Sequence, residues 1–539
     1  MSTRVAVLGG GVGGLSAAQE LAERGFEVEV YERRPDFGGK ARSIPVPGSA
    51  TPGRKPLPGE HGFRFFPSFY KHLPDSMKRI PFAGKSVFDN LVFSTRVEIA
   101  RTGKLAFLEP TRFPQTLDDW TTVFLSLFAN LGIPDSELLF FIDRLLVLLT
   151  TCQERRLAEY ENIAWWDFID AKNKSLSYQK YLGEGLTRSL VAMKAEISST
   201  RTVGYIDLQL MLGLMCSPGG FDRLLNGPTN EAWIDPWISY LKSRGVTLLG
   251  NSVVRSLELE GDRISKVLID QGGTPSNVAA DFYVSALPVE IMTGLVTNEI
   301  KSAAPSLAHL DKLQTRWMNG IQFYLKNDVP LVRGHSNYLD SPWALTSVSQ
   351  RQFWPEINFA GLGDGKVGGI LSAVISDWDA PGIVFGKAAT NCTAEEIKTE
   401  AWAQLKSHLN TSGDETLSDS NLLSWFLDPD IQFPNPSAVT NAEPLLINPA
   451  GSLQYRPEAA TEIPNLYLAS DYVRTYTDLA TMEGANEAAR RAVNAIIDAS
   501  GSSAIKAQLW PFQEPEIFKP MREYDLLRFK LGLPHGKVS

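Results

Sequence analysis

Three glycines near the N-terminus have a spacing that could bind a phosphate group. They follow residues 4–8, which are apolar and mostly β-branched, and precede residues 15–24, whose apolar side chains recur with helical spacing. Glycines at such a strand-to-helix turn let the backbone approach a pyrophosphate, and the helix N-terminus offers N–H groups and a partial positive charge. The spacing G-x-G-x-x-G therefore predicts a dinucleotide-binding turn, to which we assign Gly9, Gly11, Val12, Gly13 and Gly14.

An acidic residue and a basic stretch follow this turn. Residues 27–31 are typical of a second strand, and Glu32 comes eighteen positions after Gly14, where a carboxylate accepts hydrogen bonds from a ribose. A basic residue and then a Gly-Gly pair can reach the second side of a long pyrophosphate. A pure nicotinamide site does not require this segment, so the pattern favours FAD over NAD. The residues expected at the pyrophosphate are Arg33, Arg34, Gly39 and Lys40.

Residues 32–43 resemble the Gly-Gly doublet of the FAD-containing amine oxidase and phytoene desaturase superfamily. A second match lies near the other end of the chain, where residues 465–472 are typical of a strand and T-M-E-G-A opens a helix. The resemblance implies that Asp471 binds a ribityl hydroxyl. It also implies that the helix N-terminus faces the flavin pyrimidine, where its positive end would stabilise the reduced ring. The residues that it assigns to this end of the cofactor are Thr481, Met482 and Ala485.

Two middle segments also resemble parts of the superfamily. Residues 245–257 resemble the strand pair that delivers a backbone contact to adenine, at Val254. Residues 281–288 resemble the strand that leads to a turn of small residues over the cofactor. The alternative for both segments is sheet core that touches no ligand.

Residues 60–70 (EHGFRFFPSFY) are the most informative about the substrate. They resemble the E-x-G-x-H-x-F-F segment of plant-type phytoene and ζ-carotene desaturases, which implies that Gly62, Phe63 and Arg64 lie at the flavin. Arg64 stands where those desaturases have His, and Ser470 replaces a Gly of the C-terminal match. Arg64 is our candidate catalytic residue. Three roles stay open for it: stabilising a reduced flavin, holding a polar substrate group, or forming a structural ion pair.

The amine oxidase branch of the superfamily has features that this chain lacks. Those enzymes commonly place an aromatic residue before M-E-G-A, where this chain has Thr481, and a Lys near flavin N5, where the best match is Asn319. Those with covalent flavin use a Cys near the C-terminal motif, and no Cys follows Cys392. The resemblance thus disfavours amine oxidation and implies non-covalent FAD. Five residues before the flavin helix could line a substrate pocket: Tyr472, Arg474, Tyr476, Thr477 and Asp478.

Composition narrows the class of protein. The chain has 539 residues and a net charge of −9, which argues against a general nucleic-acid binder. Its three cysteines lie far apart, as in proteins of a reducing cytoplasm, and its six histidines show no metal-ligand spacing, so we expect no metal. No apolar run is long enough to span a membrane. Residues 138–152 come nearest, and they predict either a buried core helix or a helix half-inserted into one leaflet.

The predicted fold is α/β, with a Rossmann-like (GR2-type) FAD-binding domain and a discontinuous α+β substrate domain. The FAD domain should comprise residues 1–75, 225–300 and 445–500, the substrate domain 76–224 and 301–444, and a C-terminal extension 501–539. The resemblance implies an oxidoreductase that desaturates, or dehydroxylates, a polyisoprenoid or carotenoid-like lipid by hydride transfer to flavin N5. Two alternatives stay open: isomerisation without net redox change, and amine oxidation. We see no second G-x-G-x-x-G for NAD(P), so we expect quinone or oxygen as the electron acceptor. We expect a cytoplasmic protein, with peripheral membrane contact left open.

Overall fold

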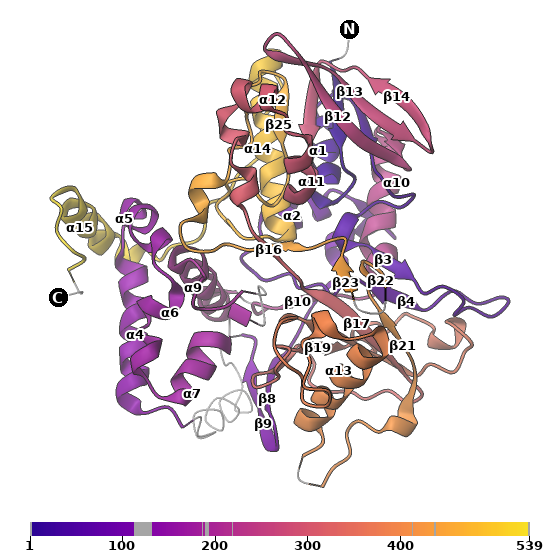
Figure 1. The fold of residues 1–539 in the computed structure, drawn as a ribbon, viewed down its shortest axis with the longest axis vertical. Coiled ribbons are helices and arrows are strands. Elements are labelled where there is room, and N and C mark those ends of the chain that lie inside the picture. Colours follow the sequence, from indigo (N-terminus) through magenta and orange to yellow (C-terminus); the bar gives the residue numbers. More distant parts are fainter. Residues whose placement is uncertain are drawn as a thin grey trace.

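A computed structural model gives the fold of the chain (Figure 1). It describes residues 3–112, 132–185, 187–188, 193–217, 219–411, 413–435 and 438–536.

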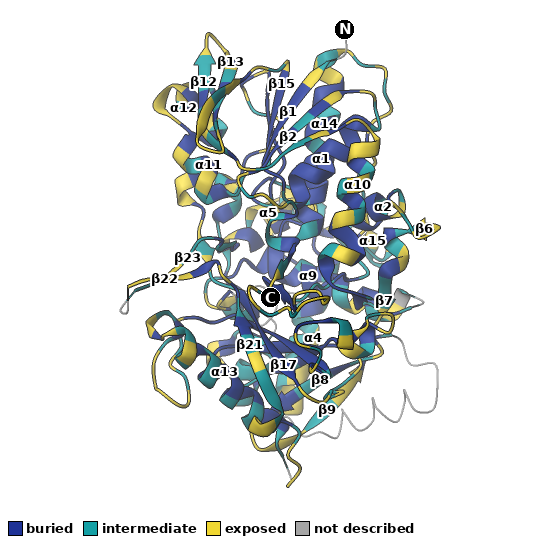
Figure 2. Ribbon diagram, turned by 90° about the vertical axis from the view of Figure 1, so that its right-hand side faces the viewer, coloured by how far each residue is buried: buried dark blue, intermediate teal, exposed yellow. Residues whose placement is uncertain are grey.

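A five-stranded parallel sheet lies in the upper part of the molecule in Figure 1. Its strands are in the order β11–β2–β1–β15–β25, and every neighbouring pair is parallel. Apolar residues, many of them β-branched, form these strands, which are mostly buried, as a parallel sheet covered by helices requires (Figure 2). The bounds are Arg4–Leu8 (β1), Glu27–Tyr31 (β2), Thr247–Leu249 (β11), Phe282–Ser285 (β15) and Leu466–Leu468 (β25).

Two helices from opposite ends of the chain pack along each other beside this sheet. They are α1 (Val12–Ala22) and α14 (Met482–Ser500), and Ala17, Ala18 and Ala488 are fully buried in their shared core. Small side chains let two helix backbones approach closely, which brings the N-terminus of α14 beside that of α1. Three further helices and an antiparallel sheet belong to the same part of the chain: α10 (Asp235–Ser243), α11 (Val289–Leu295), α12 (Asn298–Ala303), β12 (Ser252–Glu260), β13 (Arg263–Gln271) and β14 (Thr274–Val278).

A seven-stranded sheet occupies the lower part of Figure 1, in the order β21–β17–β20–β19–β18–β8–β9. All neighbours are antiparallel except β18 and β8. Helix α13 (Ala394–Leu409) packs on it over a core of its own, rich in Trp and Leu. The strand bounds are Arg96–Arg101 (β8), Lys104–Pro110 (β9), Asn319–Leu325 (β17), Ser336–Tyr338 (β18), Thr346–Ser349 (β19), Gly369–Ile375 (β20) and Leu422–Leu427 (β21).

A helical group lies at the left of Figure 1. Its members are α4 (Asp135–Thr150), α5 (Gln153–Ala158), α6 (Trp165–Phe168), α7 (Leu176–Tyr178), α9 (Thr200–Cys216) and α15 (Lys519–Lys530). Short elements connect the parts: α2 (His72–Lys78), β3 (Ser43–Pro45), β4 (Pro58–Glu60), β5 (Pro81–Phe82), β6 (Lys85–Ser86), β7 (Leu91–Phe93), β10 (Arg223–Leu225), β16 (Thr315–Arg316), β22 (Ile431–Asn435), β23 (Ala438–Asn441) and β24 (Leu445–Leu446).

The predicted fold class is therefore confirmed. The chain combines a parallel Rossmann-like sheet with a second, mostly antiparallel sheet, and segments far apart in sequence build each of them. Helix α4 is not a buried core helix, one of the two alternatives for its apolar sequence, and the half-inserted alternative stays a prediction. Its Leu145 and Leu148 are buried, whereas Leu139 and Ile142 are 67% and 52% exposed, so it is an amphipathic surface helix. Among the helices of the described ranges, none is both long enough and apolar enough to cross a bilayer.

Candidate active site

A cavity of about 600 Å³ begins at the carboxyl ends of β1, β2 and β15 and extends toward the second sheet and α9. In an open parallel sheet, this edge is where ligands bind. All but one of the residues that the sequence assigns to the cofactor line this cavity; the exception is Gly14. Their role in binding stays a prediction, but residues from both ends and the middle of the chain meet in one place.

The glycine turn is shaped by close backbone approaches. A Cβ on Gly14 would lie 1.9 Å from Gly9 O, and one on Gly13 would lie 1.9 Å from Ala469 O, so neither position accepts a side chain. Gly9 has φ +102°, in the region that favours glycine. At Gly11, in contrast, the nearest atom to a Cβ is Gly39 Cα at 3.8 Å, and the turn is open toward the cavity. Gly14 thus closes the turn from behind, while the open face is a cradle suited to a diphosphate.

The carboxylate of Glu32 braces the same turn. Its Oε2 accepts a hydrogen bond from Gly10 N (2.7 Å), and its Oε1 accepts one from Arg34 N (3.0 Å). Glu32 is buried and lines the cavity, so a lone pair on each oxygen can still accept a ribose hydroxyl.

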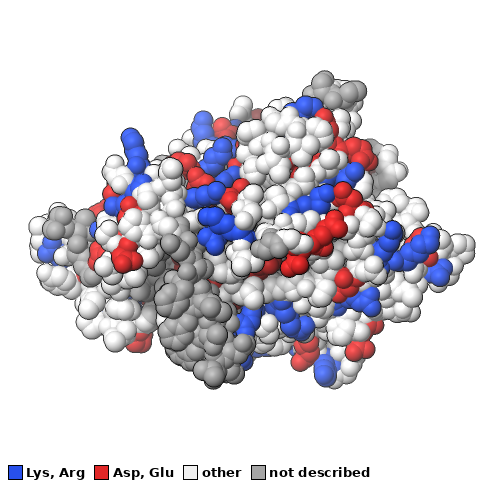
Figure 3. All heavy atoms as spheres, turned by 90° about the horizontal axis from the view of Figure 1, so that it is seen from below, with Lys and Arg blue, Asp and Glu red and all other residues white. Residues whose placement is uncertain are grey.

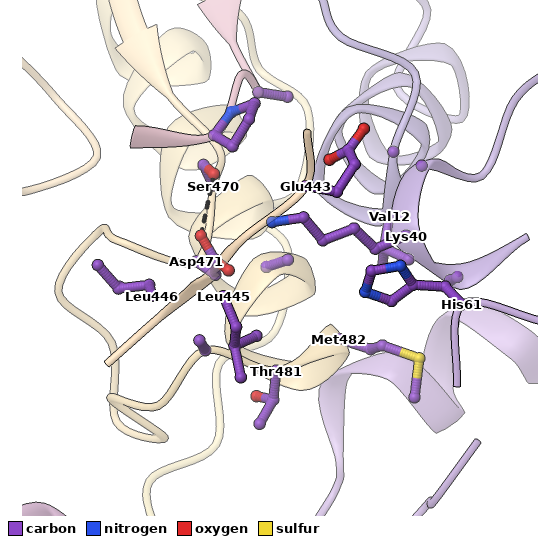
Figure 4. Close-up of a pocket in the computed structure, with 18 of the residues that line it drawn as sticks. Val12, Lys40, His61, Glu443, Leu445, Leu446, Ser470, Asp471, Thr481 and Met482 are labelled. Carbon is purple, nitrogen blue, oxygen red and sulfur yellow. Dashed lines mark hydrogen bonds between the residues drawn. The ribbon is translucent and has the colours of Figure 1, made fainter. Parts of the chain in front are cut away.

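The basic side chains that follow Glu32 are already paired with acids from the far side of the cavity. Arg33 forms an ion pair with Glu443, and Arg34 NH2 lies 2.8 Å from Glu443 Oε1 and 2.7 Å from Asp430 Oδ1. Figure 4 shows Glu443 and Lys40 at the same part of the cavity wall as Asp471. Burial opposes ionisation of Glu443, but Lys40 and the two arginines outweigh it and hold its pKa below its usual value. Arg33 and Arg34 therefore belong to the cavity wall as ion pairs with these two acids.

Arg64 is held from two sides at the cavity wall. Its NH2 donates to Lys40 O (2.8 Å) and lies 3.5 Å from Glu60 Oε2. Burial lowers the pKa of Arg64, and the attraction of Glu60 opposes that shift. Glu60 in turn accepts hydrogen bonds from Ser43 Oγ (2.9 Å) and Thr229 Oγ1 (3.0 Å). The structure therefore shows the ion pair that was one of the three roles expected of Arg64. Arg64 also lines the cavity, so it can contact a ligand bound there.

Asn319 does not belong to the cavity wall, whereas its neighbour Met318 does. The Asn319 amide donates to Asp428 Oδ2 (2.6 Å) and accepts from Asn441 Nδ2 (2.8 Å). His61 Nδ1 also lies 2.6 Å from the Asp428 carboxylate, and despite burial these contacts hold the pKa of Asp428 below its usual value.

The histidines show no metal-ligand spacing in the sequence, yet His61, Asp428 and Asp430 each offer an atom within 4.8 Å of the others. Asp428 and Asp430 are two positions apart, but His61 lies far from both in sequence, so spacing could not reveal the group. Asp430 is occupied by its ion pair with Arg34, and Asp428 by Asn319.

The N-terminus of α14 opens onto the cavity. Thr481 caps it by accepting a hydrogen bond from Gly484 N (3.0 Å) and lines the cavity beside Met482 (Figure 4). The acidic residue of the motif, Glu483, points elsewhere: it accepts hydrogen bonds from the backbone N–H groups of residues 71–73 and contacts His72 Nδ1 at 2.8 Å. Glu483 thus anchors the helix and leaves its free N–H groups to a ligand.

From the sequence, five residues between positions 472 and 478 could line a substrate pocket. None of the five lines this cavity. The segment folds away from the cavity because Arg456 and Glu487 hold its backbone. Arg456 donates to the carbonyls of Tyr472 (2.9 Å) and Val473 (2.8 Å), and Glu487 accepts from the backbone N–H of Tyr476 (2.7 Å). Asp478 is ion-paired with Arg201 and Arg456.

The far part of the cavity has an apolar wall that sequence reasoning missed. On α9, Ile206 and Leu210 face it one helical turn apart, a spacing that could have indicated a shared face. Residues 445–447 (Leu-Leu-Ile) form a second side, and Figure 4 shows Leu445 near Thr481. Phe65 and Phe69 belong to residues 60–70, a segment that the sequence already indicated, whereas the other apolar side chains come from separate segments with no common signal: Met193, Met318, Val374 and Leu479.

The comparisons with known proteins agree with this geometry. Residues 12–497 match the family model described as flavin-containing amine oxidoreductase. The chain belongs to this family. It is a flavin-dependent oxidoreductase, and the family binds FAD.

Among curated proteins, it is 24% identical to 15-cis-phytoene desaturase of Synechococcus elongatus over 92% of this chain and 96% of the relative. It is 23% identical to zeta-carotene desaturase of Synechocystis sp., over 92% and 97%.

Solved structures show the same fold at lower identity. Putrescine oxidase bound to putrescine is similar with a TM-score of 0.61 and 13% identity, covering 92% of this chain and 99% of that one. Cyclohexylamine oxidase from Brevibacterium oxydans has a TM-score of 0.59 and 12% identity, covering 93% and 100%.

Proposed function

We propose that this protein is a non-covalent FAD enzyme that desaturates, or dehydroxylates, a polyisoprenoid or carotenoid-like lipid. The observation that carries the proposal is the apolar wall beyond the glycine turn, made by α9 and residues 445–447. Such a wall suits a long hydrocarbon. The full-length similarity to two carotenoid desaturases supports the same substrate class. The division of the chain into FAD domain, substrate domain and C-terminal extension is part of the proposal.

The residues of the cavity have distinct roles in this scheme. The glycine cradle at Gly9 and Gly11 would hold the diphosphate, Glu32 the ribose and Asp471 the ribityl chain. Val254 would lie at the adenine. The N-terminus of α14 would direct its positive end at the flavin pyrimidine. FAD, when bound, supplies the acceptor for a hydride from the lipid. The apolar wall would orient the lipid chain, and a proton would leave the carbon next to the hydride donor for solvent as the double bond forms, so no paired acid and base is required of the protein.

Two observations weigh against amine oxidation. The position before the flavin helix motif is Thr481, whose hydroxyl caps the helix and forms no aromatic cage. The best match for a Lys near the flavin is Asn319, which is bound to Asp428 outside the cavity. Isomerisation without net redox change remains the second candidate, because it needs the same cofactor site and the same apolar wall.

The experiment is an anaerobic titration of the purified holoenzyme, followed by flavin absorbance. A phytoene-type or squalene-type lipid is added in one series and a polyamine in another. Bleaching by the lipid alone is the expected result, and bleaching by the amine alone contradicts the proposal. Addition of a quinone or of oxygen to the bleached enzyme then identifies the acceptor, which we expect to be one of the two.

We also propose a peripheral contact with lipid membranes. On α4, Leu139 and Ile142 are exposed, and Leu176 nearby in the helical group is 81% exposed. Helix α15, which packs on α4 and α5, also exposes the apolar side chains of Met521 and Leu527. Elsewhere, on the face seen from below, Lys and Arg alternate with Asp and Glu (Figure 3). Co-sedimentation with vesicles of anionic lipid tests the contact, and equal recovery without vesicles would contradict it.

A further inference from the structure

We propose that His61 accepts the proton that the lipid loses, and that Asp428 positions the imidazole ring for this task. The inference rests on the function proposed above, because it assigns a catalytic residue to that reaction. One C–H bond of the lipid gives its hydrogen and both bonding electrons, as a hydride, to FAD. The neighbouring C–H bond breaks, its electron pair forms the new double bond, and its proton goes to His61 Nε2, which passes it on to solvent.

The two ring nitrogens of His61 face different surroundings. Nδ1 is buried and lies 2.6 Å from Asp428 Oδ2. An ionised carboxylate can only accept, so Nδ1 carries the ring proton, and the lone pair of the neutral ring is on Nε2. Nε2 makes no hydrogen bond with any described residue, yet it is not shielded as Nδ1 is, and the ring projects into the cavity (Figure 4). A ligand in the cavity can therefore reach this nitrogen.

The other histidines that lie beside a carboxylate do not offer such a nitrogen. Four described histidines have a carboxylate neighbour: His61, His72, His335 and His408. Of these, only His61 lines the cavity. His72 Nε2 accepts a hydrogen bond from Trp510 N (3.0 Å), and His335 Nε2 is buried. In His408, Nδ1 contacts a backbone carbonyl and Nε2 the carboxylate. The His61 pair thus differs from the three structural pairs.

Backbone hydrogen bonds hold His61 and Asp428 in place relative to each other. Gly320, in β17, donates to His61 O (2.5 Å) and accepts from Asp428 N (3.0 Å). A Cβ on Gly320 would lie 2.8 Å from His61 O, so a side chain at this position would push the segments apart. The distance between the imidazole and the carboxylate is therefore set by the main chain of three separate segments.

The carboxylate of Asp428 is oriented in turn. Its Oδ2 accepts from Asn319 Nδ2 (2.6 Å), and its Oδ1 accepts from Asp430 N (3.0 Å). The Asp430 carboxylate is paired with Arg34, so Asp428 is the acid that balances the positive charge of a protonated His61. A carboxylate in this position holds the ring in the correct tautomer and stabilises the imidazolium that forms. The same contact gives the buried Asn319 a function outside the cavity.

The first test measures anaerobic flavin bleaching by a phytoene-type lipid, with FAD-loaded enzyme in a stopped-flow instrument. In His61→Gln, the rate should fall about 100-fold or more, because a positioned base contributes at least that much. The dissociation constants of FAD and of the lipid should stay within about 2-fold. Asp428→Asn should slow bleaching about 10-fold with both affinities kept. His408→Gln, which alters a buried histidine outside the cavity, is the matched control.

Chemical rescue separates a proton acceptor from a structural group. In His61→Ala, free imidazole can enter the space that the side chain leaves at the cavity wall. It should raise the bleaching rate about 10-fold or more, and it should leave the wild type and Asp428→Asn unchanged. A group that only supported the fold could not be replaced by a base in solution.

Three results would overturn the inference. One is bleaching at the wild-type rate by a folded His61→Gln or, if that variant does not fold, by Asp428→Asn. The second is a loss of FAD affinity as large as the loss of rate, which would assign His61 to the cofactor. The third is a His61→Ala enzyme that imidazole does not accelerate. Failure of the proposed function is a separate result, because the lipid would then fail to bleach the wild type.

Discussion

The two halves of the cavity are built in different ways. The cofactor half is made mainly by backbone, namely the glycine turn and the N-terminus of α14, and one side chain, the carboxylate of Glu32, braces the turn. The substrate half is made by side chains from α9, residues 445–448 and single positions elsewhere. Backbone geometry tolerates little change, whereas side chains can be exchanged one at a time. The fold alone therefore does not decide the substrate, which depends on the side chains of the site.

The largest expected effect is a loss of FAD affinity from a change confined to the cofactor half. In Gly14→Val, the new Cβ would lie 1.9 Å from Gly9 O, and the turn cannot close. We expect FAD affinity to fall by more than about 100-fold, which is measured as the fraction of purified protein that retains FAD. The control is Gly294→Ala, where no atom lies within 4 Å of the new Cβ. Normal FAD content in Gly14→Val would contradict the role given to the turn.

Glu483→Gln tests whether the flavin helix is anchored as the structure shows. Burial opposes ionisation of Glu483, but His72 and the backbone N–H groups of residues 72–73 outweigh it and lower its pKa. A carboxyl whose pKa is depressed by folding adds stability above its ordinary pKa of 4.5, and this stability is lost as pH falls through the lower, folded-state pKa.

The variant should therefore lose about 3 kcal/mol of unfolding free energy at pH 7, and the loss should shrink as the pH is lowered below 4.5. Denaturant unfolding at several pH values measures it, with the exposed Glu516→Gln as the control. If the loss of unfolding free energy in Glu483→Gln did not change with pH, the ionised carboxylate of Glu483 would not be the group that anchors the helix.

Arg64 lies at the border of the two halves of the cavity. The variant Arg64→Gln tests whether this residue acts in the reaction or only in the structure. If Arg64 acts on the reacting groups, flavin bleaching by lipid slows about 10-fold or more while FAD and lipid affinities are kept. Stopped-flow absorbance measures the rate. If instead Arg64 serves only the ion pair with Glu60, unfolding free energy falls and the rate in the folded fraction is unchanged. The second outcome would return Arg64 to a structural role.

The smallest effect is expected outside the cavity. Leu139→Glu replaces an exposed apolar side chain of α4 with a charge. Binding to anionic vesicles should weaken about 10-fold, and flavin bleaching by a detergent-dispersed lipid should be unchanged. Leu176→Gln offers a milder change on the same helical group. Equal vesicle binding by wild type and Leu139→Glu would exclude this face from the membrane contact.

The residues of the cofactor half could be predicted from the sequence because each of its motifs is short and continuous. The strand at residues 4–8, the glycine turn and the acid at Glu32 follow one another, and the closing motif at residues 481–485 is as compact. The ion pairs of Arg33 and Arg34 with Glu443 join positions about four hundred residues apart, so no local pattern predicts them. Residues 472–478 lay close in sequence to the flavin helix, but Arg456 and Glu487 turn them away from the cavity.

The most direct test of the central claim is the mass of the lipid after an anaerobic single turnover, with FAD-loaded enzyme in excess over a phytoene-type substrate. The proposed desaturation predicts a product with two hydrogen atoms fewer and bleached flavin in equal amount. An isomer of unchanged mass, formed without net bleaching, would contradict net oxidation and assign the same cavity to isomerisation.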